Sequence, residues 1–81
     1  MNVKVRFLAN YRELVGSGEM VLDLKKGATV GSLLEELYQR LPRLAQQRDE
    51  AIVSVNRKQA PERQELHEMD EIVLLPPAVG G

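Results

Sequence analysis

The sequence contains no cysteine and one histidine, and both shortages exclude classes of chemistry. Without cysteine, the 81-residue chain has no disulfide, no thiolate nucleophile and no cysteine-based metal site, which fits a reducing compartment. With His67 as the only histidine, a histidine cluster or a Ser-His-Asp triad with a spare base is hard to build. No glycines have the spacing of a phosphate-binding loop. We therefore expect little catalysis by this chain alone.

Long apolar runs and blocks of like charge are also missing. No segment approaches the ~20 apolar residues of a membrane span, and residues 1–6 alternate charged with apolar side chains, which is unlike a secretory signal. A cytoplasmic protein without membrane association is the expectation. Eleven basic and twelve acidic residues form no basic cluster, and only three residues are aromatic, so nucleic-acid binding is not expected.

The acidic residues that are present predict no metal site. Glu35 and Glu36 lie in a segment of helical periodicity, and their simplest interpretation is a solvated helix face. Glu68, Asp70 and Glu71 precede a strand-like run, where Asp70 is expected to stabilise a turn. Metal coordination by these carboxylates is the minority interpretation.

Apolar periodicity predicts an α+β fold. Alternation predicts strands near residues 3–8, 20–24, 52–55 and 71–75, the first two forming a hairpin with residues 10–15 as a short excursion. Apolar residues at helical spacing predict a helix from Val30 to Leu41, capped by Thr29 and ended by Pro42. Residues 43–50 suggest a loop or a ragged helical turn, and a short extra strand could lie between Gln59 and Leu66. One helix packed on a mixed four- to five-stranded sheet buries these residues economically.

One helix can cover only one face of such a sheet, which leaves apolar residues on the other face. If Val3, Val5 and Phe7 face the helix, Leu8 falls on the opposite side. By the same alternation, Val73 and Leu75 are also expected to face outward, and these three residues would form an apolar docking patch. Scattered surface hydrophobic residues are the alternative interpretation.

The most informative segment is the last one, residues 76–81, which we predict to be a tail that follows a domain of residues 1–75. Two prolines end strand pairing and stiffen the exit, whereas two terminal glycines leave the carboxylate free of side chains. Such an arm can deliver the Gly81 carboxylate into a narrow pocket of another protein. Once converted by ATP to an acyl-adenylate, that carbon is electrophilic and accepts sulfur or an amine. The bare backbone of Gly80 and Gly81 lets the reacting groups approach closely.

With these features, the chain resembles the MoaD/ThiS family of ubiquitin-like β-grasp sulfur carriers, in particular the MoaD type that forms the small subunit of molybdopterin synthase. The resemblance runs nearly end to end, and its most specific part is the Asp-Glu turn, apolar strand, Pro-Pro pair and Gly-Gly end. The stretches that carry it are Tyr11-Arg12-Glu13-Leu14-Val15-Gly16, Thr29-Val30, Val55-Asn56 and residues 70–81.

The resemblance implies a non-catalytic, sulfur-donating subunit that binds no cofactor itself. An E1-like enzyme would use ATP to adenylate Gly81, and a sulfur donor would convert the adenylate to a thiocarboxylate. The tail would then enter the large synthase subunit, which supplies the catalytic side chains and builds the molybdopterin dithiolene on a cyclic pyranopterin precursor in a two-plus-two assembly. Gly81 would carry the sulfur and Gly80 would provide clearance. The implied partner contacts are Leu75, Pro76, Pro77, Ala78 and Val79, with Phe7, Leu8, Val73 and Arg12 as further candidates.

Two departures from the family pattern concern turns. Many members have a glycine before the Asp-Glu turn where this chain has Met69, which would be strained at a positive φ. Asn56 is followed by Arg57 and not by glycine, so we expect a connection longer than a tight hairpin turn. Three other functions stay open: a sulfur carrier for thiamine synthesis, a ubiquitin-like modifier conjugated through Gly81, and an adaptor with an inert tail.

Overall fold

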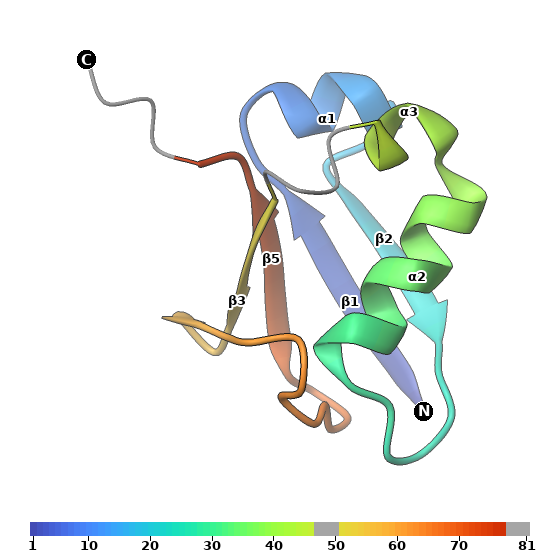
Figure 1. Ribbon diagram of the computed structural model, residues 1–81, viewed down its shortest axis with the longest axis vertical. Helices are drawn as coiled ribbons and strands as arrows, with labels where there is room; N and C mark the ends of the chain where they lie inside the picture. Colours follow the sequence, from blue (N-terminus) through green and yellow to red (C-terminus); the bar gives the residue numbers. More distant parts are fainter. Residues whose placement is uncertain (47–50, 78–81) are drawn as a thin grey trace.

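A computed structural model describes residues 1–46 and 51–77 of the chain. In this part of the protein, five strands form one mixed sheet in the order β2-β1-β5-β3-β4 (Figure 1). β1 and β5, at the centre, run parallel, and the other neighbouring strands are antiparallel. The elements are β1 (Asn2–Phe7), α1 (Asn10–Val15), β2 (Glu19–Asp23), α2 (Val30–Arg40), α3 (Pro42–Ala45), β3 (Ile52–Val55), β4 (Lys58–Gln59) and β5 (Glu71–Leu75). The predicted α+β fold, with one main helix on a mixed sheet, is confirmed.

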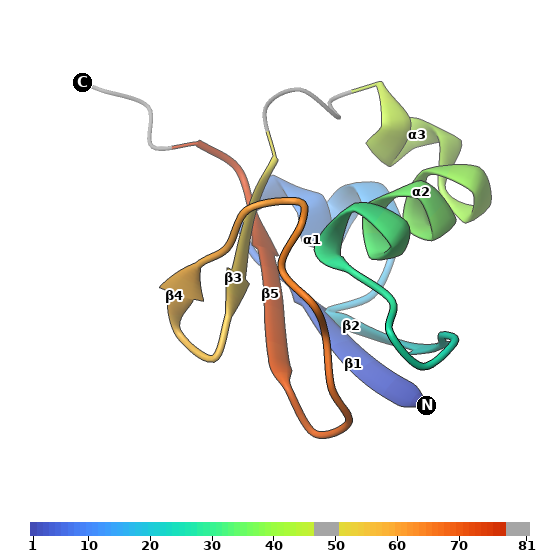
Figure 2. The ribbon, with the colours of Figure 1, turned by 60° about the horizontal axis from the view of Figure 1, so that its bottom comes forward.

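Helix α2 forms because its sequence combines a good N-terminus with one apolar stripe. The Thr29 hydroxyl accepts the backbone N–H of Ser32, and the Ser32 hydroxyl accepts the N–H of Thr29, which together make a capping box. Arg40 is the last residue of α2, and Pro42 begins the short helix α3. Figure 2 shows the helices on one side of the sheet and none on the other. The helix boundaries predicted from Thr29 and Pro42 are therefore confirmed.

The core lies between α2 and the covered face of the sheet. Alternation along β1 buries every second side chain, and the same holds for β5. The buried hydrophobic residues are Val3, Val5, Phe7, Tyr11, Leu22, Leu24, Val30, Leu33, Leu34, Leu37, Tyr38, Leu44, Val53, Val55, Leu66, Ile72 and Leu74.

The connection between β3 and β4 corrects one prediction. Val55 pairs with Lys58, so only Asn56 and Arg57 lie in the turn, and both have positive φ values (51° and 72°). This is the backbone of a tight two-residue hairpin, and the longer connection expected from the missing glycine is wrong. Asparagine tolerates the left-handed region better than most residues, and its side chain is held here by hydrogen bonds described below.

Two smaller differences concern local structure. Residues 10–15, expected as an excursion between strands, form α1, which Gly16 caps at the C-terminus with φ 85°. An extra strand was expected between Gln59 and Leu66, whereas β4 spans Lys58–Gln59, so only its second residue falls in that interval. Among the described residues, none of the helices has the length and apolarity needed to cross a membrane.

Candidate functional site

The uncovered face of the sheet is most apolar at the end of β5. Strand register places Val21, Lys4 and Glu71 in one row of this face, in which Val21 is the apolar side chain. The next row holds Arg6, Val73 and Ser54, so Val73 is the only apolar side chain there. Two rows that mix polar side chains with one apolar side chain each therefore precede the end at which β5 leads into the C-terminal segment (Figure 1).

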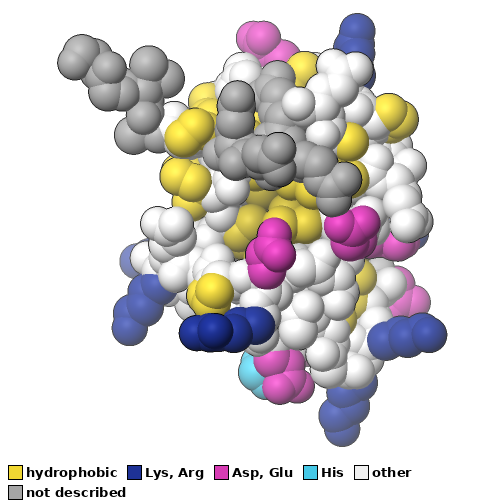
Figure 3. All heavy atoms as spheres, viewed as in Figure 1, with side chains coloured by type: hydrophobic (Ala, Val, Ile, Leu, Met, Phe, Trp, Pro, Cys, Tyr) yellow, Lys and Arg dark blue, Asp and Glu magenta, His cyan; other side chains and the backbone are white. Residues whose placement is uncertain are grey.

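The last row is entirely apolar. Leu75 pairs with Ile52 of β3, and on its other side the backbone N–H of Leu8 donates to the carbonyl of Leu74 at 3.1 Å. Leu8 is 40% exposed, and Val73, Leu75 and Ile52 are half-buried. We call Leu8, Ile52, Val73 and Leu75 the apolar patch. Figure 3 shows the molecule from the opposite side, which the helices cover, with hydrophobic side chains exposed at the upper left near the end of β5.

Sequence reasoning placed three of these four residues on the open face but did not assign Ile52 to it. The signal was available, because Ile52 and Ser54 alternate with the buried Val53 and Val55. A short run of four mostly apolar residues can be fitted to either face until its pairing with β5 is known.

Two other predicted contact residues lie away from the patch. Phe7 is 1% exposed and packs in the core, because it occupies an inward position of β1. Its side chain offers no surface to a partner, so the expectation that it contributes to docking is wrong for this structure. Arg12 lies on α1, and its guanidinium lies beside Gly18, where a Cβ added to the glycine would be 3.5 Å from Arg12 Nε. Gly18 accepts the N–H of Phe7 on the β2 side of β1, so this contact places the Arg12 guanidinium across β1 from the patch residues on β5 and β3.

The tail begins directly after the apolar row. Pro76 is half-buried and Pro77 is exposed, and β5 ends before them as the two prolines predict. Ala78, Val79 and the two terminal glycines lie outside the described residues. The domain boundary after residue 75 and the roles of these four residues stay predictions.

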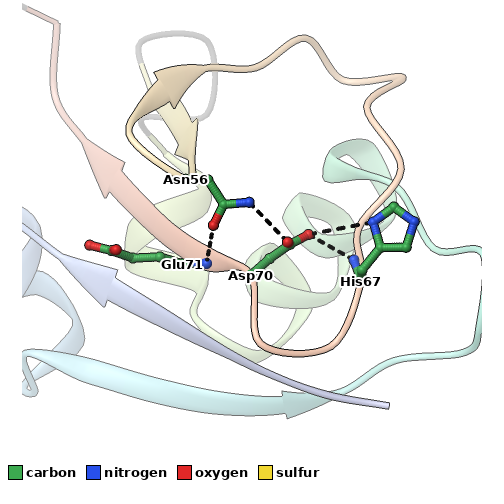
Figure 4. Close-up of polar contacts among 4 residues, drawn as sticks. All are labelled: Asn56, His67, Asp70 and Glu71. Atoms are coloured by element: carbon green, nitrogen blue, oxygen red, sulfur yellow. Dashed lines mark hydrogen bonds and ion pairs between the residues drawn. The ribbon is translucent and has the colours of Figure 1, made fainter.

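The opposite end of β5 is held by polar contacts (Figure 4). Asn56 exchanges two hydrogen bonds with Glu71: its backbone N–H donates to the Glu71 carbonyl at 2.8 Å, and its Oδ1 accepts the Glu71 N–H at 2.9 Å. Asn56 Nδ2 also donates to Asp70 Oδ1 at 3.0 Å, while Asp70 Oδ2 accepts the backbone N–H of His67 at 2.7 Å. We call Asn56, His67, Asp70 and Glu71 the polar clamp. The expected role of Asp70 in a turn is confirmed.

The segment held by the polar clamp contains a residue with a strained backbone. Met69, between His67 and Glu71, has φ 72° and is 96% exposed, so its side chain contributes no packing to offset the strain. The concern raised by the missing glycine is therefore confirmed. Throughout residues 1–46 and 51–77, no three His, Cys, Asp or Glu side chains come together as a metal site would require.

Comparison with known proteins places these features in a family. The chain is 28% identical to the Arabidopsis thaliana molybdopterin synthase sulfur carrier subunit over 81 residues, covering 100% of this chain and 84% of that protein. The structure of SAMP1 from Haloferax volcanii superposes with a TM-score of 0.89 at 27% identity, with full coverage of both chains. The structure of the complex between subunits 1 and 2 of the Helicobacter pylori molybdopterin-converting factor contains a chain with the same fold. That chain superposes with a TM-score of 0.72 at 22% identity, with full coverage of both chains. The model of the ThiS family matches residues 5–81, and the chain therefore belongs to that family.

Proposed function

We propose that this chain is the sulfur carrier subunit of a molybdopterin synthase, with the Gly81 carboxyl group as the site of chemistry. The observation that carries the proposal is the apolar row at the root of the tail, where Leu8, Leu75 and Ile52 lie side by side on the open face. A small domain that exposes an apolar row beside its terminal arm can dock on a partner while the arm enters that partner's active site. The family membership and the function of the Arabidopsis relative support the same role.

In the first step, an E1-like enzyme activates the tail. A Gly81 carboxylate oxygen attacks the α-phosphorus of ATP, pyrophosphate leaves, and the product is an acyl-adenylate. Sulfur from a donor, at the oxidation level of hydrosulfide, then attacks the acyl carbon and displaces AMP. The product is a thiocarboxylate, and no net oxidation or reduction takes place on the carrier.

In the second step, the large synthase subunit binds the loaded carrier. The thiocarboxylate sulfur attacks a carbon of the cyclic pyranopterin precursor, a C–S bond replaces a C–O bond at that carbon, and the displaced oxygen leaves with its electron pair and takes up a proton. Water then hydrolyses the resulting thioester at its acyl carbon, which returns Gly81 to a carboxylate and leaves the sulfur on the pterin. Two such deliveries supply the two sulfurs of the dithiolene. The carrier contributes the nucleophilic sulfur and the docking surface, and the catalytic side chains belong to the large subunit.

The composition of the tail suits this transfer. Gly80 and Gly81 present no Cβ, so the nucleotide and the attacking sulfur can come within the ~3–3.5 Å that reaction requires. Pro76 and Pro77 restrict the backbone near the domain, which lowers the conformational entropy lost when the arm is inserted. The activating enzyme and the large subunit would use the same apolar patch in turn.

A single-turnover transfer experiment tests the proposal. The carrier is loaded with isotopically labelled sulfur at Gly81, purified, and mixed with the large subunit and the pyranopterin precursor. We expect the label to appear in the pterin and the carrier to return to its unlabelled mass. Label that stays on the carrier, with a large subunit shown active on another carrier, would contradict the molybdopterin role.

A ubiquitin-like modifier is the second candidate function. Its support is the full-length similarity to SAMP1, a small archaeal modifier protein, at 27% identity. On that alternative a lysine amine, and not sulfur, attacks the adenylated Gly81 and forms an isopeptide bond. Mass spectrometry of total protein digests separates the two, because conjugation leaves glycine remnants on lysines of other proteins. A thiamine-pathway carrier is separated by the acceptor: its label would enter thiazole and not the pterin.

A further inference from the structure

Strand β2 forms one edge of the sheet, and its register fixes which backbone groups point away from β1 (Figure 1). Met1 and Leu24 exchange both backbone hydrogen bonds, and Phe7 donates its N–H to the Gly18 carbonyl. In an antiparallel pair such closely bonded positions alternate with unbonded ones. The N–H and C=O groups of Glu19, Val21 and Asp23 therefore point outward, along the free edge.

One of these three positions is already closed. The Ser17 hydroxyl donates to the Glu19 carbonyl at 2.8 Å and accepts the Glu19 N–H at 3.3 Å. Within the described residues, the backbone groups of Val21 and Asp23 have no such partner. The edge therefore offers four free backbone groups, the N–H and C=O of Val21 and of Asp23. The contact of Ser17 with Glu19 limits this stretch at one end.

The side chains beside this stretch have a distinct charge pattern. Glu19, Val21 and Asp23 share the open face of the sheet, and Val21 is 56% exposed. Each carboxylate has one cation on the β1 side: Lys4 Nζ lies 4.0 Å from Glu19, and the Met1 amino group lies 3.3 Å from Asp23. The side chains of Glu19 and Asp23 nevertheless remain 56% and 83% exposed, so their outer sides are free to meet further cations.

We propose that the edge of β2 binds an extended segment of a partner protein as an added antiparallel strand. An apolar residue of that segment would lie opposite Val21 and exchange two backbone hydrogen bonds with it. Lysine or arginine two residues away on each side would lie opposite Glu19 and Asp23. Backbone bonds give such added strands their affinity, and alternate side chains give them specificity. The recognised pattern is therefore basic, any, apolar, any, basic.

The same charges argue against a second copy of this chain as the occupant. If two β2 strands paired antiparallel about Val21, Glu19 of each copy would face Asp23 of the other on the same side of the sheet. Like charges directly opposite one another destabilise a strand pair. The edge is thus protected against self-association while it stays open to a basic segment.

This surface is distinct from the apolar patch. β1 lies between β2 and β5, so a strand added beyond β2 does not cover Leu8, Val73 or Leu75. A partner held at the edge could therefore remain bound while the tail is delivered elsewhere. The inference does not depend on the fate of Gly81, and a failure of the proposed function would leave it standing.

A peptide titration tests the inference. The probe is an acetylated and amidated peptide of sequence Gly-Lys-Thr-Val-Thr-Lys-Gly, followed by NMR of the isotopically labelled full-length protein. We expect saturable shifts along β2 and slower hydrogen exchange for the amides of Val21 and Asp23. The amides of Met20 and Leu22 should keep their exchange rates, because they already bond to β1. Absence of saturable binding, or shifts centred on Leu75, would overturn the proposal.

Charge reversal gives the matched control. The same peptide with glutamate in place of both lysines should bind about tenfold more weakly, because two cross-strand ion pairs become two repulsions. The double variant Glu19→Lys, Asp23→Lys should invert this preference. Equal binding of both peptides to both proteins would overturn the proposed specificity. Val21→Pro removes one edge N–H and should abolish binding, with circular dichroism to show that the variant is folded.

Finally, sedimentation equilibrium of the protein alone tests whether a second copy of the chain occupies the β2 edge. We expect a monomer across the accessible concentrations. A dimer that the Val21→Pro substitution dissociates would show that a second copy occupies the edge, and would overturn the inference.

Discussion

The two ends of strand β5 are built on opposite principles. At its start, Asn56 and Asp70 close a network of short hydrogen bonds around the Glu71 backbone. At its end, Leu75 lies in an apolar row on an uncovered face, directly before the tail. At the first end, the side chains of Asn56 and Asp70 form hydrogen bonds that hold the strand in place. At the second end, the Leu75 side chain stays partly exposed on the open face. On the proposed function, hydrogen bonds fix the register at the start of β5, and a partner docks at its end.

Register matters here because side chains alternate along a strand. A slip of β5 by one residue would turn Val73 and Leu75 into the core and expose Ile72 and Leu74. The polar clamp opposes such a slip, since its hydrogen bonds join Glu71 and Asp70 to one residue of the neighbouring strand connection, Asn56. The two ends should therefore respond differently to substitution.

The largest expected effect comes from the tail. Deletion of Gly81 should abolish thiocarboxylate formation while leaving the free energy of unfolding unchanged, because removing one terminal glycine removes no side chain. Mass spectrometry after incubation with the activating enzyme measures the first, and urea denaturation measures the second. Sulfur transfer that survives the deletion would contradict the carrier mechanism.

Next in size is the docking end of β5. Leu75→Glu should weaken binding to the large subunit by about 2 kcal/mol, roughly thirtyfold, because a charge is placed in an apolar contact. Isothermal titration calorimetry measures the affinity. Met69→Glu is the matched control, since it adds the same charge at the other end of the strand and should leave the affinity unchanged. Equal losses in both variants would remove the distinction between the two ends.

The clamp end should show the reverse behaviour. Asp70→Ala removes the acceptor of the His67 N–H and of the Asn56 side-chain amide, which should cost about 1–2 kcal/mol and lower the Tm on the order of 10 °C. Asp70→Asn keeps one acceptor oxygen and should lose less. Both variants should bind the large subunit normally below their Tm. A loss of affinity measured at a temperature where the variants are fully folded would show that the polar clamp directly affects the apolar patch.

The smallest effect concerns the strained turn. Met69→Gly should raise the free energy of unfolding by about 0.5–1 kcal/mol, because glycine adopts φ 72° without strain and the exposed methionine side chain loses no packing. Chemical denaturation measures the change, with Met69→Ala as the control that keeps the Cβ and should gain nothing. A lower free energy of unfolding for Met69→Gly would mean that the methionine side chain makes stabilising contacts, and would contradict this account.

Much of the fold could be predicted because local signals and burial agree. The alternation of Val3, Val5 and Phe7 and the capping residue Thr29 are readable within a few positions, and both led to the observed structure. The open-face positions of Leu8, Val73 and Leu75 followed from the same alternation. These features depend on nearest neighbours along the chain.

What the sequence did not reveal depends on distant contacts. The tight turn at Asn56 and Arg57 lacks its usual glycine, and the amide of Asn56 is fixed by Asp70, 14 residues away. The sequence is compatible with Phe7 as a core residue and as a contact residue, and its burial in the structure decides for the core. The position of Ile52 beside Leu75 required the pairing of β3 with β5. Composition alone specifies none of these pairings.

The measurement that tests the central claim most directly is the intact mass of the protein after incubation with ATP, a sulfur donor and the cognate E1-like enzyme. We predict a gain equal to one exchange of oxygen for sulfur, located at Gly81 by fragmentation. An unchanged mass, with the enzyme shown active on another carrier, would contradict the claim that this carboxyl group carries sulfur.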